Sequence, residues 1–214
     1  MRKSIAIVVV LALFAGSANA ALLWDNEMTP NGFSGRAISP PNFPDIRVAD
    51  DFTVDISGRF TIEDFHANVI EDAGWTDGGE ITLEIRADSG GQPGDIVGSH
   101  TGEYTRMFLD MQYFGRDDYD YWIEGIDISL PDGTYWATIR NASGGGAGTN
   151  YWMTSDGGAD GPGSSTGFFS LDGGGSWAEE GAGWHHAFQV TGVPEPTTCL
   201  LLGLGGLALL RRRN

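Results

Sequence analysis

Residues 126–140 read IDISLPDGTYWATIR, and this stretch decides the fold class. Apolar and polar side chains alternate on both sides of Pro131-Asp132-Gly133, which is the period of a β-strand with one buried face. Proline, aspartate and glycine in succession favour a turn. The stretch therefore predicts two antiparallel strands, 126–130 and 134–140, joined as a β-hairpin.

The same alternation continues outward along the chain. Residues 81–86 (ITLEIR) and 52–56 (FTVDI) alternate without interruption. Residues 60–62 and 65–69 also alternate, but in opposite phase. An extra residue in one strand produces such a phase change, so the sequence predicts a β-bulge near Glu63-Asp64.

Helical patterning is nearly absent from the body of the chain. Glycine or proline interrupts most windows, and residues 141–183 are especially rich in glycine. Short strands are still expected at 151–153 and 167–171, with a last strand at 186–190. The sequence predicts one all-β domain over residues 21–192, an antiparallel β-sandwich of jelly-roll type.

The charge of the chain is strongly acidic and unevenly distributed. The 214 residues carry 12 Lys+Arg against 29 Asp+Glu, a formal charge of −17. Outside residues 1–20 and 193–214, the body keeps 7 basic and 28 acidic residues, a charge of −21, with no lysine and no cysteine. Phosphate contacts need clustered Lys and Arg, so the composition excludes nucleic acid as the default partner. It favours cations or neutral sugars as ligands.

Residues 1–20 have the three zones of a secretory signal peptide. Basic residues at the start are followed by an apolar run over 5–14 and by the small residues Ala18-Asn19-Ala20. We expect a signal helix that signal peptidase removes after Ala20. The apolar run is too short to cross about 30 Å of hydrocarbon.

The C-terminal tail, residues 193–214, also has three parts. Val193-Pro194-Glu195-Pro196 precedes an apolar run over 197–210 that contains the only cysteine, and Arg211-Arg212-Arg213 follow. The run predicts a short hydrophobic transmembrane helix whose arginines stay on the cytoplasmic side. The order and spacing resemble the PEP-CTERM sorting signal of exported Gram-negative proteins.

This resemblance implies a route. Proteins with such tails are held transiently in the inner membrane, recognised at Pro-Glu-Pro by an exosortase and processed. They then reach the cell surface or an extracellular polysaccharide matrix. A similar tail ends some ice-binding proteins, but the Thr-x-Thr array of a flat ice-binding face is missing from this sequence. A plain C-terminal membrane anchor is the alternative.

Three motifs of the body support a second resemblance. Residues 48–54 (VADDFTV), 85–94 (IRADSGGQPG) and 133–136 (GTYW) occur in an order similar to that of a β-sandwich common in PEP-CTERM proteins. The resemblance implies a fold and no catalytic residues.

Carboxylates that could offer several hard oxygen ligands at once make calcium the metal to expect. The candidates are Asp117, Asp118, Asp120, Glu124, Asp156 and Asp160. Neither EF-hand spacing nor the Gly-Gly-x-Gly-x-Asp repeat occurs. A solvated acidic loop is therefore the alternative to a calcium site.

No catalytic motif is evident in the sequence. Gly32-Phe33-Ser34-Gly35 is one residue short of a Gly-x-Ser-x-Gly elbow, and no histidine lies in a His-Glu-x-x-His pair. His185 and His186 on one strand would point to opposite faces and could not hold one metal together. Paired carboxylates suit glycoside hydrolysis, but 28 acidic residues make chance pairs abundant.

All seven tryptophans lie in the body, and aromatic rings can stack on sugar rings. Trp75, Trp122 and Trp177 have glycine or acidic neighbours and are the expected exposed ones. The sequence thus predicts a non-catalytic, exported surface or matrix protein that associates with polysaccharide. Two alternatives are a calcium-dependent carbohydrate-binding module and a secreted glycosidase, which would need two carboxylates in a Trp-lined cleft.

Overall fold

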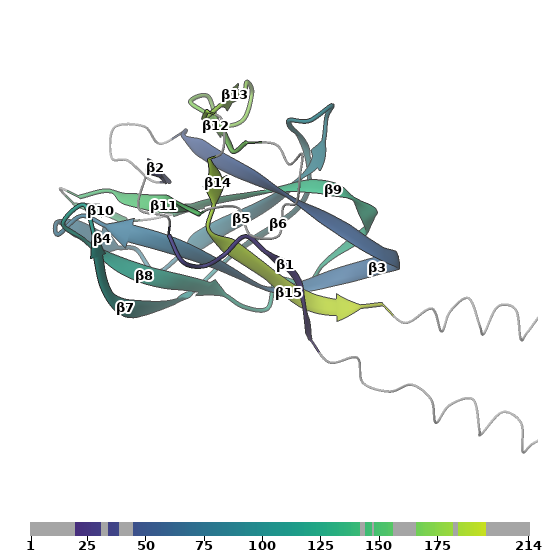
Figure 1. Cartoon of the computed structure of the whole chain (residues 1–214), viewed down its shortest axis with the longest axis horizontal. Coiled ribbons are helices and arrows are strands. Elements are labelled where there is room, and N and C mark those ends of the chain that lie inside the picture. Colours follow the sequence, from purple (N-terminus) through teal and green to yellow (C-terminus); the bar gives the residue numbers. More distant parts are fainter. Residues whose placement is uncertain are drawn as a thin grey trace, which may run out of the picture.

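The computed structural model describes residues 20–30, 34–38, 45–141, 144–146, 148–155, 166–181 and 184–195 (Figure 1). Every regular element in these ranges is a β-strand, which confirms the all-β prediction. No helix among them has the length and apolar character needed to cross a membrane. The expected signal helix and the expected helix of the tail lie outside the described residues.

Fifteen strands make up the described body. They are β1 (Ala21–Asp25), β2 (Gly35–Ala37), β3 (Arg47–Glu71), β4 (Trp75–Asp77), β5 (Ile81–Asp88), β6 (Pro93–Gly102), β7 (Thr105–Tyr113), β8 (Arg116–Ile123), β9 (Ile128–Asn141), β10 (Gly144–Gly146), β11 (Asn150–Ser155), β12 (Phe168–Ser170), β13 (Ala178–Glu179), β14 (His185–His186) and β15 (Phe188–Pro194).

The long strand β3 organises the sheet. Thirteen strands form one hydrogen-bonded network whose main path runs β1-β15-β3-β9-β5-β6, and β4 and β10 form a separate pair. The first part of β3 pairs with β9 and β12, and its last part pairs with β8, β15 and β11. All of these pairings are antiparallel. The sheet curls on itself as a half-barrel, with β3 running through both parts (Figure 1).

The predicted hairpin at Pro131-Asp132-Gly133 is wrong. Both predicted strands belong to the single strand β9, which pairs with β3 on either side of this point. Four residues of β3, 55–58, bulge out here, and Asp132 Oδ1 accepts hydrogen bonds from the amides of Ile56 and Gly58 at 3.3 Å each. The turn-forming residues thus build a shared corner, where β3 and β9 bend together (Figure 1).

The predicted bulge near Glu63-Asp64 is confirmed. Thr191 of β15 pairs with Asp64 and the next residue, Gly192, pairs with Ile62, so Glu63 is the extra residue of β3. Its carbonyl oxygen accepts the amide hydrogen of Ile126 at 3.0 Å instead of a β15 partner. The bulge therefore links β3 to the segment that precedes β9.

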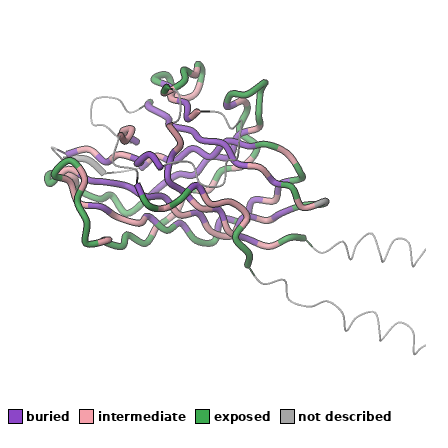
Figure 2. The backbone as a smooth tube through the Cα atoms, in the orientation of Figure 1, coloured by how far each residue is buried: buried purple, intermediate pink, exposed green. Residues whose placement is uncertain are grey.

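The concave side of the curled sheet holds the main hydrophobic core (Figure 2). Alternate residues of each strand supply it, as Phe65 from β3 and Phe188 from β15 show, with stacked rings 5.5 Å apart. Trp152 of β11 meets both rings edge-on. The residues between these core positions point to the convex side, which carries the sites described next.

Candidate functional site

The register of the sheet builds a row of side chains across its convex face. Gln189 of β15 lies beside His66 of β3, His66 beside Trp122 of β8, and Trp122 beside Thr105 of β7. Phe65 precedes His66 and is fully buried in the core, so strand alternation directs His66 outward. The row therefore lies on the face of the sheet that points away from the core.

One ring of this row, that of Trp122, is 37% exposed. It stacks on His66 with centroids 5.2 Å apart and planes inclined by 19°. His66 Nδ1 in turn lies 3.1 Å and 3.2 Å from the two carboxylate oxygens of Asp120. Asp120 therefore holds the imidazole, and the imidazole supports the indole; we call these three residues the Trp122 platform.

The chemistry of the Trp122 platform suits a sugar ring. An indole face is a large, flat apolar surface, and it has few conformations to lose when a ligand stacks on it. Asp120 and Gln189 supply hydrogen-bond acceptors beside it, and Thr105 supplies a hydroxyl. An apolar plate with polar groups at its edge matches the alternating C–H and hydroxyl surfaces of a saccharide.

A buried polar pair lies on the same face beyond the platform. Asn68 Nδ2 donates a hydrogen bond to Asp118 Oδ1 at 2.8 Å, and both residues are fully buried. Asp118 Oδ2 and Asn68 Oδ1 have no hydrogen-bond partner in the described structure. Burial raises the pKa of Asp118 to about 6, although the hydrogen bond from Asn68 opposes this shift.

The other two candidate stacking residues are less accessible than Trp122. Trp177 is half-buried against the small cluster of Ala49, Trp136 and Phe168, and Arg86 lies 5.2 Å from its ring. Trp75 is half-buried on β4. The Nε1 atoms of Trp75 and Trp177 are buried.

Strand alternation separates the three calcium candidates that lie in β8. Residues 117–120 form part of β8, so Asp118 and Asp120 share the convex face while Asp117 points the other way and accepts a hydrogen bond from Gln112 at 2.7 Å. Asp156 and Asp160 lie outside the described residues. Within the described ranges, no group of three or more His, Cys, Asp or Glu side chains could hold a metal ion. Calcium binding stays a prediction.

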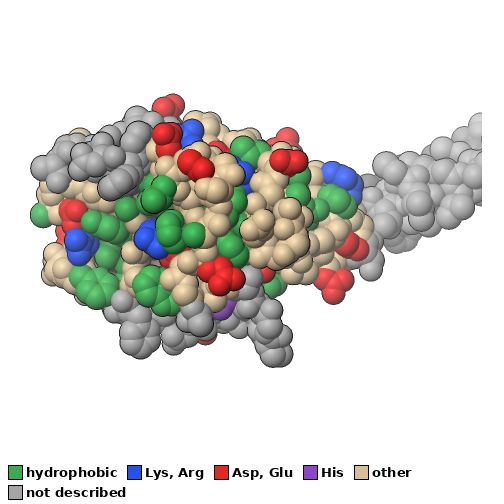
Figure 3. All heavy atoms as spheres, turned by 90° about the horizontal axis from the view of Figure 1, so that it is seen from above, with side chains coloured by type: hydrophobic (Ala, Val, Ile, Leu, Met, Phe, Trp, Pro, Cys, Tyr) green, Lys and Arg blue, Asp and Glu red, His purple; other side chains and the backbone are tan. Residues whose placement is uncertain are grey.

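Glu124 lies in an open depression of about 430 Å³ at the β3 bulge. Its described lining consists of Thr61, Glu63, Asp64, Glu124, Gly125 and Asp127. Four of these six residues are acidic, but none is aromatic. The depression thus differs from the Trp-lined cleft that the glycosidase alternative requires. Figure 3 shows other acidic side chains scattered over the upper face of the molecule.

Sequence reasoning missed a second buried polar network. Glu71, at the end of β3, accepts hydrogen bonds from Tyr121 Oη at 2.5 Å and from Arg106 Nε at 2.6 Å. Asn150 Nδ2 donates to Tyr121 Oη at 3.2 Å. Burial raises the pKa of both Glu71 and Tyr121. Residues 65, 67 and 69 face the core, so the same alternation extended to residue 71 places Glu71 on the core face as well.

The two adjacent histidines have different partners. His186 is fully buried, stacks on Trp152 at 4.6 Å and lies 3.5 Å from Glu180 Oε2 through Nε2. Arg36 Nε donates to the other oxygen of Glu180 at 2.7 Å. Although burial opposes the shift, His186 and Arg36 lower the pKa of Glu180. His185 Nδ1 lies 3.9 Å from Asp50 Oδ1.

The C-terminal end of the body runs directly into the Pro-Glu-Pro segment. Val193 and Pro194 still belong to β15, and the amide of Glu195 donates to the carbonyl of Arg59 at 2.8 Å. Glu195 Oε1 accepts hydrogen bonds from Ser129 Oγ and from Thr61 Oγ1, which lower the pKa of Glu195. Val193 and Pro194 are therefore part of the sheet, and Glu195 is hydrogen-bonded to it.

The remaining predicted processing residues fall at the edges of the structure. Ala20 is the first described residue and is exposed. Ala18, Pro196 and Arg211–Arg213 lie outside the described residues.

The family comparison assigns the tail. No curated protein matches the chain. Residues 192–214 match the family described as the PEP-CTERM protein-sorting motif. The chain therefore carries a PEP-CTERM protein-sorting motif at residues 192–214, attached directly to an all-β body.

Proposed function

We propose that this protein is an exported, exosortase-processed component of the cell surface or extracellular matrix that binds polysaccharide without catalysis. The contact would be made by the Trp122 platform, with Asp120, Gln189 and Thr105 bonding sugar hydroxyls. We also infer that the curled sheet is a two-layered, jelly-roll-like sandwich. The convex surface of such a sandwich presents a broad site to a polymer.

The exposed, supported ring of Trp122 carries this proposal. A tryptophan without a neighbouring support would be free to rotate away from a ligand, whereas this one stacks on His66 at 5.2 Å. The acidic body, at −21, favours neutral sugars over anionic polymers at the Trp122 platform. Asp120 is already hydrogen-bonded to His66 and so is oriented before a ligand arrives.

The route of export rests on the sorting motif. In this route, signal peptidase would cut after Ala20, and the apolar tail would then hold the chain transiently in the inner membrane. An exosortase would recognise Pro194-Glu195-Pro196. The match of residues 192–214 to the motif supports the exosortase step. The arginines at 211–213 would keep the end of the tail on the cytoplasmic side.

A glycan array probed with the purified full chain tests the binding. The wild type should bind at least one polysaccharide, and Trp122→Ala should lose that signal. Phe114→Ala is the matched control, because Phe114 is 57% exposed but lies in the β7–β8 turn away from the platform. Equal binding by wild type and Trp122→Ala, or no binding by the wild type to any glycan, would contradict the proposal.

The same samples distinguish the alternatives. Release of new reducing ends from a bound glycan would identify a glycosidase. Loss of binding in a calcium chelator, with recovery in millimolar calcium, would identify a calcium-dependent module. The proposal expects neither result.

A further inference from the structure

Basic side chains are rare in this protein, yet three of the seven in the body gather at one place. Arg47 of β3 and Arg140 of β9 are cross-strand neighbours, one position beyond the paired residues Val48 and Ile139. Arg86 of β5 lies on the same convex face. Like charges directly opposite each other destabilise a sheet, so this arrangement needs a compensating anion.

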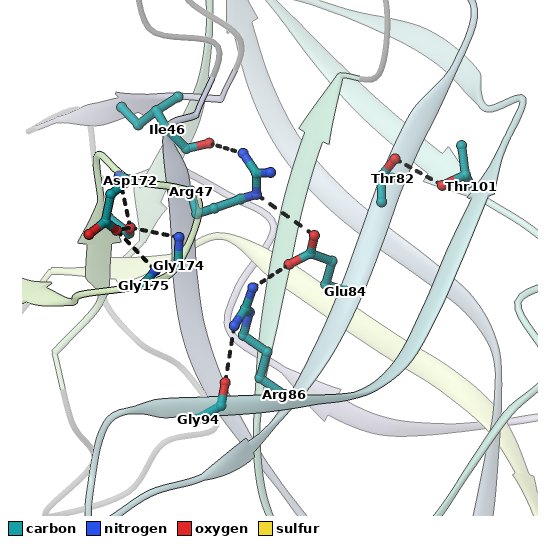
Figure 4. Close-up of polar contacts among 11 residues, drawn as sticks. Ile46, Arg47, Thr82, Glu84, Arg86, Gly94, Thr101, Asp172, Gly174 and Gly175 are labelled. Atoms are coloured by element: carbon teal, nitrogen blue, oxygen red, sulfur yellow. Dashed lines mark hydrogen bonds and ion pairs between the residues drawn. The ribbon is translucent and has the colours of Figure 1, made fainter.

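The protein supplies that compensation only in part. Glu84 accepts a hydrogen bond from Arg86 at 2.7 Å and lies 3.7 Å from Arg47 Nε (Figure 4). Arg47 and Arg86 also donate to the carbonyls of Ile46 and Gly94. Glu84 thus contacts two guanidinium groups that are 8% and 6% exposed, and the charge of Asp45 adds a weaker attraction for Arg47.

The third guanidinium, that of Arg140, has no compensating partner among the described residues. Its Nε atom is buried, and the group makes neither a hydrogen bond nor an ion pair with any described residue. The neighbouring hydroxyl of Thr138, on the same strand and face, is fully buried and also lacks a partner there. Burial, and next the charge of Arg140, lower the pKa of Arg47. The guanidinium of Arg140 and the hydroxyl of Thr138 thus leave several hydrogen-bond donors without an acceptor among the described residues.

The loop over residues 171–177, between β12 and β13, lies closely over one side of this cluster. A side chain at Gly174, whose φ is +95°, would place its Cβ 2.7 Å from Arg86 Nη2. Asp172, whose carboxylate is bonded by Ser170, Gly175 and Ser176, holds the loop in this position (Figure 4). Arg86 is therefore enclosed, while Arg140 is only half-buried and can reach a ligand.

We propose that Arg47, Thr138 and Arg140 form a binding site for an oxyanion of the carboxylate, sulfate or phosphate class. Arg140 would contact the anion with its planar guanidinium, since this group binds two oxygens of such a ligand at once. Arg47 would add charge, and Thr138 a hydroxyl donor. The site is separate from the Trp122 platform and does not depend on sugar binding there.

Thermal unfolding of the purified full chain tests the site. At fixed ionic strength in chloride, millimolar sulfate or phosphate should raise the Tm with a saturating dependence on concentration. Arg140→Gln should lose this response and melt no lower than the wild type in chloride, because it removes the like-charged neighbour of Arg47. Arg59→Gln is the charge-matched control; Arg59 is surface-exposed and paired with Glu195, and this variant should respond as the wild type does.

Sulfate also stabilises proteins generally, so the difference between variants decides. Equal shifts in wild type and Arg140→Gln, or no shift in the wild type, would overturn the proposal. A failure of Arg140→Gln to fold would also count against it, since an unpaired guanidinium is not needed for folding. Arg140→Lys keeps the charge but not the planar fork; it should show a smaller shift, and an undiminished one would contradict the assignment.

Two further binding measurements identify the source of the anion. Oligogalacturonate binding that is lost in Arg140→Gln, with no binding of neutral galactose oligomers, would indicate an acidic polysaccharide. A response to inorganic sulfate or phosphate alone would indicate a small free anion. Both results support the site. Trp122→Ala should retain the sulfate response, so failure of the sugar proposal and failure of this one give different results.

Discussion

Asp118 illustrates at the scale of a single residue how this acidic body places a carboxylate out of water. It is fully buried, and Asn68 and the amide of Tyr119 stabilise its charge by hydrogen bonding, but Oδ2 has no partner among the described residues. A buried, half-bonded carboxylate is costly when ionised, and a proton removes that cost. Trp122 is the opposite case, because its exposed ring is available for a ligand.

Asp118 should make stability depend on pH. Its pKa is about 6 in the folded protein against an ordinary 3.8, so the folded state retains a proton that the unfolded state releases between these values. Stability should therefore be unaffected by this group below pH 3.8, fall as pH rises, and reach its full loss, on the order of 2–3 kcal/mol, above pH 6.

The variant Asp118→Asn removes the charge while keeping the shape, so it should unfold at higher denaturant concentration than the wild type at pH 7.5. The gain should shrink towards pH 4. Asp55→Asn, at an exposed position, serves as the control and should show little change. Urea unfolding at the two pH values measures the effect; a pH-independent difference for Asp118→Asn would contradict the assigned titration.

Tyr121→Phe should destabilise the buried network around Glu71. The substitution removes the hydroxyl that donates to Glu71 and accepts from Asn150, leaving both groups short of a partner in the core. We expect a loss of about 1–3 kcal/mol. Tyr135→Phe is the comparison, because that hydroxyl donates to the carbonyl of the exposed Pro131 and its loss should cost less. Similar losses for the two variants in denaturant unfolding would argue against a special role for the network.

The elements show which parts of the fold the sequence can predict. Strict alternation identified the strand over residues 81–86 and both parts of β9, and a phase change located the bulge at Glu63. The hairpin failed because Pro131-Asp132-Gly133 has the composition of a turn, while β3 supplies a matching bulge to which Asp132 bonds. The matching bulge contains Ile56, which lies 76 positions from Asp132 in the chain, so a local sequence pattern could not predict it.

The candidate sites are predictable to a smaller extent. Glycine and acidic residues nearby predict an exposed Trp122, but they predict exposed Trp75 and Trp177 equally. Both of these are half-buried, Trp177 by packing against residues of distant strands. Neither the stack of Trp122 on His66 nor the pairing of Arg47 with Arg140 can be read from spacing. Both depend on the register between strands that are far apart in sequence.

Gly192 tests the close approach of β15 to β3, just where the sorting motif begins. A Cβ atom at this position would lie 2.0 Å from the carbonyl oxygen of Thr61, so Gly192→Ala must push the two strands apart. We expect a loss of more than about 2 kcal/mol in chemical unfolding. At Gly58, where a Cβ would meet nothing within 4 Å, the same substitution should change stability by less than about 0.5 kcal/mol. Equal effects would refute the strand geometry.

The whole molecule combines an acidic all-β body with a C-terminal sorting motif that starts inside its last strand. Glu195 of the motif is hydrogen-bonded to Thr61 and Ser129, so the body and the motif adjoin without a linker. The charge of −21 is not uniform, because Arg47, Arg86 and Arg140 gather on one face. The protein therefore combines an exposed aromatic ring at Trp122 with a largely buried cluster of basic side chains at which Arg140 is half-exposed.

The central claim is that the exported body binds polysaccharide through the Trp122 platform. Isothermal titration of the full chain with a glycan identified on the array measures it most directly. The account predicts that Trp122→Ala weakens binding by about tenfold or more, which corresponds to roughly 1.4 kcal/mol. Trp122→Phe should retain part of the affinity, and Phe114→Ala all of it. An unchanged dissociation constant in Trp122→Ala would contradict the account.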